Sequence, residues 1–240
     1  MEILYLITAR GGSKGVPKKN IKILGELPLI AYKIKSIQKS RFAGRIILST
    51  DDEEIAKIGK EFGAEVPFLR PDYLATDTSS SVDVVIHAMD WIEQNENKKY
   101  DYLCLVEPSS PFATYEDYDN AIQELLDSNV DTLLSVKEVE VNKIFIHELT
   151  KDYKMDKFYE AILNLKNQRR QDFEKQYTMN GCIYIAKWDY LKERRMFHSI
   201  NSKAYIMDEK YSVEIDTIDN FNYAEYLIKT NKIDLKYWKV

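Results

Sequence analysis

The sequence predicts a three-layer α/β protein of Rossmann-like type, in which helices cover both faces of a mainly parallel, twisted β-sheet. Short apolar runs alternate with helical patterns over residues 1–136, an order typical of parallel strands joined by crossover helices. Some runs, such as YLCLVE at residues 102–107, are continuously apolar, as expected for strands buried on both faces. We therefore expect residues 1–240 to form a single domain.

The elements of the first half follow from their periodicity. Strands are expected at residues 2–8, 45–50, 102–107 and 131–136. Helices are expected at residues 28–40, 52–63, 79–92 and 114–126. Apolar residues recur on one side of each helix, as Ile30 and Ile34 do in the first. Gly63 is suited to end the second helix, and Thr114 with Asp117 has capping-box spacing at the start of the fourth.

The regular alternation fades after residue 137. Residues 180–187 and 211–216 regain strand character, and residues 217–230 are expected to form a closing helix. The intervening segment, residues 140–180, is rich in charge and tyrosine. We interpret it as an excursion from the main sheet that carries substrate or partner-subunit contacts, with a small separate domain as the alternative.

Composition narrows the class of function. The net charge of -5 and the pI of about 5.4 disfavour a nucleic-acid partner. No run of about 18 apolar residues exists to span a membrane, and no signal peptide is recognisable, so a cytoplasmic location is expected. Cys104 and Cys182 lie in apolar runs without a CxxC pattern, which favours core packing over a metal site or a disulfide.

The clearest functional signal follows the first strand. Residues 9–20, ARGGSKGVPKKN, join glycines and cationic side chains at the carboxyl end of a buried strand, where open α/β sheets bind ligands. Backbone N–H groups and cations of such a loop bind anions. The spacing matches neither GxxxxGK[ST] nor GxGxxG, and Pro17 disfavours a helix directly after the loop. We expect a phosphate-binding loop; the alternative is a solvated basic turn.

The loop pattern R-x-x-S-K-G-x-P-x-K-N resembles the CMP-sialic acid synthetase (acylneuraminate cytidylyltransferase) family. Other blocks resemble the family in the same order over nearly the whole chain, namely LSTDDEEIAKIGKEFGAEVPFLRPDYLATDTSSS, VEPSSPF, RRQDF, NGCIYI and SVEIDTIDNF. The resemblance implies a nucleotidyltransferase fold and a Mg²⁺-dependent enzyme. Such an enzyme joins CTP to the anomeric hydroxyl of a nonulosonic acid, such as sialic or legionaminic acid, and releases pyrophosphate. A homodimer with contacts at about residues 140–180 is also implied.

The resemblance assigns the phosphate loop residue by residue. The matching side chains are Arg10, Lys14, Lys19 and Asn20. Backbone N–H groups expected to complete the cradle are those of Gly11, Gly12 and Ser13. Lys14 is the expected principal partner of the charge that develops in the transition state. Arg10 has the planar fork that holds two phosphate oxygens.

The segment LRPDYLATDTSSS matches the part of the family that frames the cytidine. Arg70 and Ser81 are therefore the expected nucleotide contacts on this side. Serines before a helix also cap it, so helix capping is the alternative role for residues 79–81.

The segment SVEID provides the expected metal site. Glu214 and Asp216 lie two residues apart in an expected strand, so their carboxylates project from one face. One or two carboxylates together with nucleotide phosphates suit Mg²⁺. The family usually has D-x-D here, so Asp216 is the expected direct ligand and Glu214 one that reaches the ion directly or through water. Solvent-facing charges on an edge strand are the alternative.

The acceptor side departs from the family pattern. Lys143, Arg170 and Asn180 match residues that the family places near the sugar acid. Thr178 stands where many members have arginine, and Glu107 stands where glutamine is common. The carboxylate of Glu107, if it faces the acceptor, would repel an acidic sugar unless it bonds an ammonium or hydroxyl group. Two other functions stay open, namely a cytidylyltransferase for an octulosonic acid or a small phosphorylated metabolite, and a nucleotide-binding module without catalysis.

Overall fold

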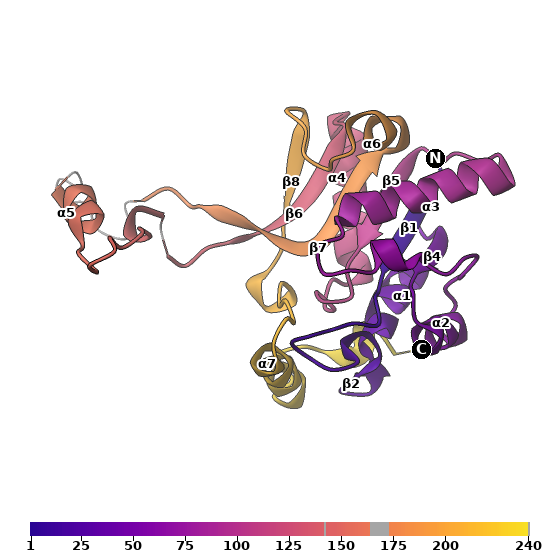
Figure 1. The fold of residues 1–240 in the computed structure, drawn as a ribbon, viewed down its shortest axis with the longest axis horizontal. Helices are drawn as coiled ribbons and strands as arrows, with labels where there is room; N and C mark the ends of the chain where they lie inside the picture. The colour runs from indigo at the N-terminus through magenta and orange to yellow at the C-terminus, as the bar shows by residue number, and fades with distance from the viewer. Residues whose placement is uncertain (142, 164–172, 240) are drawn as a thin grey trace.

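The protein is described by a computed structural model that covers residues 1–141, 143–163 and 173–239 (Figure 1). Its main sheet has the strand order β4-β1-β5-β7-β6-β8. The strands are β1 (Ile3–Thr8), β4 (Arg45–Ser49), β5 (Tyr102–Val106), β6 (Thr132–Glu138), β7 (Tyr177–Lys187) and β8 (Ser202–Ile206). Only β7 runs antiparallel to its neighbours among these strands. The expected mainly parallel sheet is confirmed.

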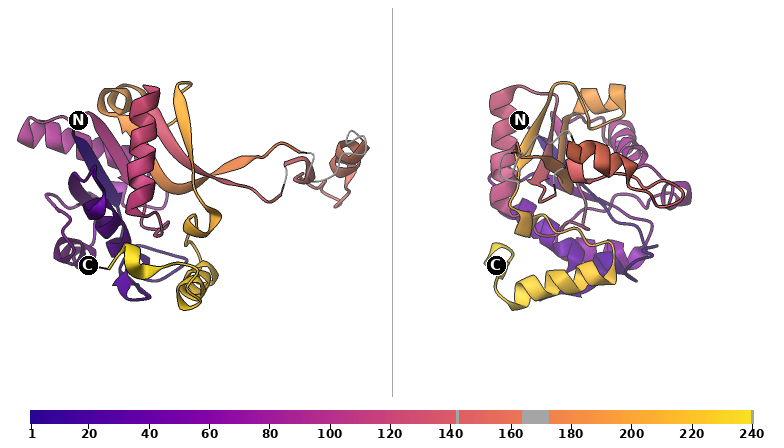
Figure 2. Two further views of the ribbon diagram at one scale, coloured as in Figure 1. Left: turned by 180° about the vertical axis from the view of Figure 1, so that it is seen from behind. Right: turned by 90° about the vertical axis from the view of Figure 1, so that its left-hand side faces the viewer.

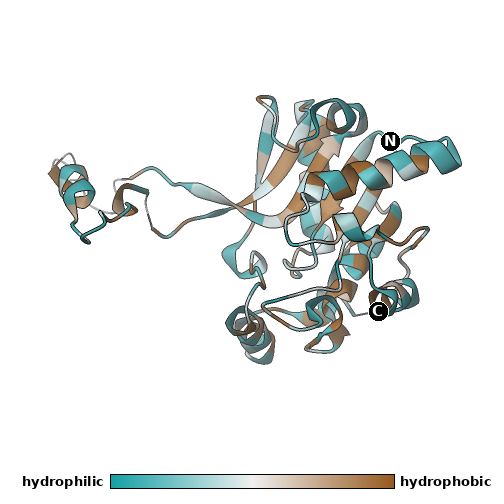
Figure 3. Ribbon diagram, in the orientation of Figure 1, coloured by the Kyte–Doolittle hydropathy of each residue, from teal (hydrophilic) through white to brown (hydrophobic). Residues whose placement is uncertain are grey.

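Helices cover both faces of this sheet, as Figure 2 shows from two further sides. One face is covered by α1 (Leu29–Lys39), α2 (Glu53–Glu61) and α4 (Tyr115–Ser128), and the other by α3 (Ser81–Glu96) and α6 (Trp188–Arg194). Strand β1 separates two core clusters because its side chains alternate. Tyr5 belongs to the cluster formed with α1, α2 and α4, and Leu6 belongs to the cluster formed with α3 and α6. Figure 3 shows apolar residues in the strands of the body and an alternation of apolar and polar residues along helices such as α3.

A third cluster lies at the carboxyl edge of the sheet. Helix α7 (Ile218–Lys229) packs there with a short hairpin, β2 (Ile23–Leu24) and β3 (Leu27–Pro28). Phe221 and Leu227 of α7 join Trp238 and Leu24 in this cluster, and all four are buried. The cluster anchors the segment before α7, which forms one wall of the site described below.

Most sequence expectations for individual elements are confirmed. The capping box of Thr114 and Asp117 is present at the start of α4, and Gly63 follows α2 with a left-handed φ of 101°. Cys104 and Cys182 are buried and free, as expected for core residues. Within the described ranges, the helices are too short or too polar to cross a lipid bilayer. The hairpin, α6 and β8 were not anticipated.

The expected strand at residues 211–216 is wrong. Val213 and Ile215 do point into the third cluster, so the apolar alternation is real. The backbone, however, runs past the loop after β5 and is held there by a hydrogen bond from Ile215 N to Ser109 O, at 2.8 Å. Burial of alternate residues therefore occurs here without strand pairing.

The described residues between β6 and β7, namely 139–141, 143–163 and 173–176, leave the sheet and form an arm that extends away from the body (Figure 1). The arm carries the short 3-10 helix η3 (Lys143–Phe145) and the helix α5 (Asp156–Leu163), neither of which contains a buried residue. Exposed apolar side chains of the arm include Phe145, Ile146, Leu149, Tyr159, Ile162 and Leu163.

Candidate active site

A cavity of about 380 Å³ opens at the carboxyl ends of β1 and β5. Cationic residues from the loop after β1 line one side of it, namely Arg10, Lys14 and Lys19. Three carboxylates line the same cavity, namely those of Glu107, Glu214 and Asp216. Parallel strands place their carboxyl ends at one edge, which explains how residues so distant in sequence converge. The structure thus brings together the expected phosphate-loop cations and the expected metal ligands.

A second cavity of about 240 Å³ adjoins the first through Thr8 and Arg10, which line both. Arg70 and Ser81, the expected cytidine contacts, line this second cavity. Arg10 therefore stands between a compartment lined by cations and carboxylates and a compartment bounded by the residues expected to frame a nucleoside. This arrangement fits an elongated ligand with a charged end and a neutral end.

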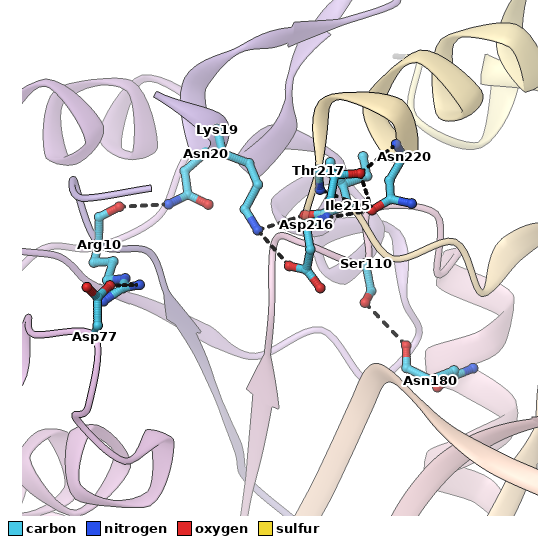
Figure 4. Close-up of polar contacts among 10 residues, drawn as sticks. All are labelled: Arg10, Lys19, Asn20, Asp77, Ser110, Asn180, Ile215, Asp216, Thr217 and Asn220. Atoms are coloured by element: carbon cyan, nitrogen blue, oxygen red, sulfur yellow. Dashed lines mark hydrogen bonds and ion pairs between the residues drawn. The ribbon is translucent and has the colours of Figure 1, made fainter. Parts of the chain in front are cut away.

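The phosphate loop is braced from inside by Asn20. This residue is buried, and its Nδ2 donates to the carbonyl oxygen of Arg10 at 2.9 Å, closing the loop on itself (Figure 4). The N–H of Gly11 donates to Asp51 Oδ1 at 3.1 Å, and the N–H of Ser13 donates to Gly11 O at 3.0 Å. These two N–H groups would have to leave their partners before they could bind phosphate.

The segment that carries the metal-ligand candidates touches the phosphate loop directly. Lys19 Nζ donates to the carbonyl oxygen of Ile215 at 2.7 Å and lies 3.2 Å from Asp216 Oδ1 (Figure 4). Because Lys19 is mostly buried whereas Asp216 is largely exposed, the lysine fixes the backbone and leaves the carboxylate accessible. A Cβ added at Gly15 would overlap the carbonyl oxygen of Asp216, so glycine is required at this contact.

Asp77 was not anticipated in the site. Its carboxylate forms ion pairs with Arg10, at 2.6 Å, and with Lys14. The hydrogen bond from Lys14 and the bond from Arg10 lower the pKa of Asp77. A sequence clue existed, since Asp77 lies in the block LATDTSSS that frames the second cavity, but its long-range partners were not readable from spacing.

Arg70 and Ser81 are held in different ways. Arg70 is buried, and its guanidinium donates to Ser49 Oγ at 3.1 Å and to Ser49 O at 2.6 Å. Burial lowers the pKa of Arg70 to about 10. Ser80 accepts from Val82 N and caps α3, whereas Ser81 lines the second cavity. Capping and cavity lining are thus divided between neighbouring serines.

The carboxylates of the first cavity lie close together on the side facing β7. Burial raises the pKa of Glu107, and the nearby charge of Glu214 raises it further. Burial and the charge of Asp216 likewise raise the pKa of Glu214. Gly181 separates the two glutamates: a Cβ there would lie 3.3 Å from Glu214 Oε1 and 3.7 Å from Glu107 Oε2. The wall is electronegative and lacks room for a larger residue at Gly181.

The residues present fit a magnesium ion that a nucleotide would bring with it. Within the part of the chain that the structure describes, no three acidic, histidine or cysteine side chains form a preformed metal cage. Glu214 and Asp216 nevertheless line one cavity together with cationic side chains. Mg²⁺ commonly takes one or two carboxylates, several waters and substrate phosphates rather than an all-protein cage.

The acceptor candidates are dispersed. Asn180 is buried, and its side chain is fully engaged: Oδ1 accepts from Ser135 Oγ at 2.6 Å, and Nδ2 donates to Ser212 Oγ at 2.9 Å. Asn180 therefore joins β6, β7 and the segment before Glu214 rather than facing the cavity. Lys143 lies in η3 on the arm and does not line the cavity. Arg170 lies outside the described residues.

Comparison with known proteins supports the chemistry of this site. The cytidylyltransferase family matches residues 4–237. The chain is 31% identical to a pseudaminic acid cytidylyltransferase of Campylobacter jejuni, with 96% of this chain and 98% of the relative covered. It is 33% identical to a CMP-N,N'-diacetyllegionaminic acid synthase of Campylobacter jejuni, with 98% of each covered.

A solved structure supports the fold independently. The structure of a CMP:2-keto-3-deoxy-manno-octonic acid synthetase complexed with CTP matches with a TM-score of 0.69 and 14% identity, covering 96% of this chain and 100% of the other. Together with the converging cations and carboxylates, these relationships confirm the resemblance predicted from the sequence. The chain is a nucleotidyltransferase that belongs to the cytidylyltransferase family, among the relatives of CMP-sialic acid synthetase.

Proposed function

We propose that this enzyme transfers the cytidylyl group of CTP to the anomeric hydroxyl of a nonulosonic acid. In this reaction the hydroxyl oxygen bonds to the α-phosphorus, the bond from that phosphorus to the bridging oxygen breaks, and pyrophosphate leaves with the electron pair. The hydroxyl proton passes to a base or to solvent. The observation that carries the proposal is the single cavity that Arg10, Lys14 and Lys19 line together with Glu214 and Asp216.

The described residues divide the work between the two cavities. Arg10 and Lys14 neutralise the triphosphate and stabilise the charge on the departing pyrophosphate. Lys19 holds the backbone of Ile215 and so positions Asp216. Arg70 and Ser81 bound the cavity in which the cytidine would lie. Binding of the nucleoside and activation of the phosphates thus come from separate segments that meet at Arg10.

We infer that Mg²⁺ is the cofactor and that Asp216 and Glu214 would hold it together with the nucleotide phosphates. When bound, the ion supplies charge neutralisation at the phosphate oxygens. Asp216 is the better placed direct ligand because its side chain is largely exposed, whereas burial and the charge of Asp216 raise the pKa of Glu214.

The acceptor class is supported by the pseudaminic and legionaminic relatives, which cover nearly the whole chain. Glu107 is the residue of this chain most suited to distinguish acceptors, since it lies in the electronegative wall of the cavity. A carboxylate there accepts hydrogen bonds from hydroxyl or amide N–H groups of a sugar.

We also propose that the enzyme is a cytoplasmic homodimer. Its arm exposes apolar side chains that a second copy would cover, including Tyr159 and Ile162 at helical spacing. A second copy would also bring Lys143, which lies on the arm in η3, to a site other than its own. The two free cysteines fit a reducing compartment, and the net charge of -5 disfavours nucleic acid as a partner.

The direct test measures pyrophosphate release with CTP, ATP, GTP and UTP against a panel of acceptors. The panel contains pseudaminic, legionaminic and sialic acids, an octulosonic acid, and small phosphorylated alcohols. We expect release with CTP and a nonulosonic acid. Release only with the octulosonic acid or a phosphorylated alcohol would reassign the acceptor, and no release with any pair would overturn the proposal.

A further inference from the structure

Asp77 forms ion pairs with the cationic side chains that the proposed reaction needs for binding phosphate. Its carboxylate oxygens contact Arg10, at 2.6 Å, and Lys14. Figure 4 shows the Arg10–Asp77 pair apart from the Lys19–Asp216 pair, so the two carboxylates take different members of the cationic set. A carboxylate that bridges two cations has the charge and the geometry of a bound anion.

The segment that presents Asp77 is a compact turn between η2 (Asp72–Leu74) and α3. Its hydrogen bonds are local: Thr76 Oγ1 and Ser79 Oγ lie 2.7 Å apart, and Ser79 Oγ donates to Tyr73 O of η2 at 3.1 Å. The far side of the turn borders a cavity of about 680 Å³. The hydrogen bond between Thr76 and Ser79 would persist if the turn shifted, and the cavity leaves space beside it.

We propose that Asp77 is an internal competitor for the phosphate-binding cations, and that a polyphosphate displaces it on binding. This inference rests on the proposed function for the identity of the natural polyphosphate, CTP. Asp77 neutralises Arg10 and Lys14 while the site is empty, and it raises the concentration at which any anion requiring both cations occupies the site. Anions that bind weakly, such as inorganic phosphate, then leave the site largely unoccupied.

The strength of these contacts suits exchange. The side chain of Asp77 is 41% exposed and that of Lys14 is 81% exposed, and ion pairs at such positions are weak and screened by salt. One carboxylate is also less charged than a diphosphate or triphosphate group. A polyphosphate can therefore replace Asp77. When no polyphosphate is bound, Asp77 keeps Arg10 and Lys14 paired.

Displacement of Asp77 also reaches the nucleoside end of the site. Thr76 and Ser79 of the same turn line the second cavity together with Arg70 and Ser81. Loss of the contacts of Asp77 with Arg10 and Lys14 would thus change the cavity wall against which the cytidine would lie. Departure of pyrophosphate would let Asp77 return and would restore that wall.

The test is calorimetric binding of inorganic pyrophosphate to the full chain at low ionic strength, without CTP or acceptor. We expect Asp77→Asn to bind pyrophosphate about three- to tenfold more tightly than the unmodified protein. The gain should shrink as salt is added. Asp72→Asn is the matched control, since this exposed residue of the neighbouring 3-10 helix lines neither cavity of the site.

A double-mutant cycle locates the effect. In a Lys14→Ala background the gain caused by Asp77→Asn should be smaller, because one of the two competed cations is absent. Equal or weaker pyrophosphate binding by Asp77→Asn would overturn the inference; weaker binding would make Asp77 a residue that positions Arg10. Binding of pyrophosphate requires no turnover. The binding experiment therefore tests the role of Asp77 even if the release assay shows no activity and the proposed function fails.

Discussion

Gly15 and Asp216 meet through their backbones, because any side chain at Gly15 would overlap the carbonyl oxygen of Asp216. Gly15→Ala should therefore push the phosphate loop away from the carboxylate segment, lower the stability by about 1–3 kcal/mol, and lower turnover. Gly12→Ala is the control for stability, since an added Cβ at Gly12 meets nothing within 4 Å. Thermal unfolding of both variants checks the expectation; equal melting temperatures would contradict it.

Lys14→Ala should remove turnover without unfolding the protein. Lys14 is largely exposed and lines the first cavity, so its loss affects the charge of the site rather than the core. We expect a decrease in kcat of about 100-fold or more and an unchanged melting temperature. Lys18→Ala is the control, because Lys18 pairs with Glu54 instead. Undiminished pyrophosphate release by Lys14→Ala would refute the assigned role.

The fold was predictable because burial on both faces of parallel strands leaves continuous apolar runs. The hairpin β2–β3 and strand β8 escaped prediction for opposite reasons: the hairpin is too short to show a period, and β8, SKAYI, lies at a polar sheet edge. The strand expected at residues 211–216 is wrong for a third reason. Val213 and Ile215 are buried in the third cluster, which gives the alternating pattern of a strand without strand pairing.

The site was predictable where a motif is continuous in sequence, as around Arg10 and Lys14. It was not predictable where contacts cross between segments. Asp77 shows no local signal of its ion pairs, and Asn180 gave no sign that its amide would be consumed by Ser135 and Ser212. Tertiary contacts of this kind depend on the assembled sheet rather than on spacing.

Asp216→Asn should raise the Mg²⁺ concentration needed for half-maximal activity by about tenfold or more. The amide retains the size of the carboxylate and can still accept from Lys19, so the fold of the segment should persist. Asp219→Asn, three residues along in the exposed first turn of α7, is the control. A magnesium titration of both variants checks this, and coincident curves would remove Asp216 from the metal site.

Glu107 should make stability depend on pH in metal-free buffer. Burial raises its pKa in the folded state above the ordinary value of 4.5, so the folded protein binds this proton more tightly than the unfolded chain. The associated stability is present below pH 4.5 and is lost as pH rises through the raised pKa. Glu107→Gln should therefore stabilise the protein at neutral pH and change little at low pH. Melting temperatures that differ equally at both pH values would contradict this.

Ile162→Lys should weaken the proposed dimer. Ile162 is 58% exposed on α5, where a partner would bury it, and a buried unpaired lysine is strongly unfavourable. Light scattering after size-exclusion chromatography should show a shift toward monomer. Glu160→Lys on the same helix controls for charge. A chain that is monomeric before substitution would reject the proposed assembly.

Strand β7 connects the arm to the core. Its first three residues, from Tyr177 to Met179, are exposed, and from Asn180 onward it is mostly buried between β5 and β6. One continuous strand thus links the arm to Gly181, which faces Glu107 and Glu214. Because β7 is one continuous strand, the arm is rigidly connected to the core. A displacement of the arm would therefore be transmitted along β7 to one wall of the candidate cavity.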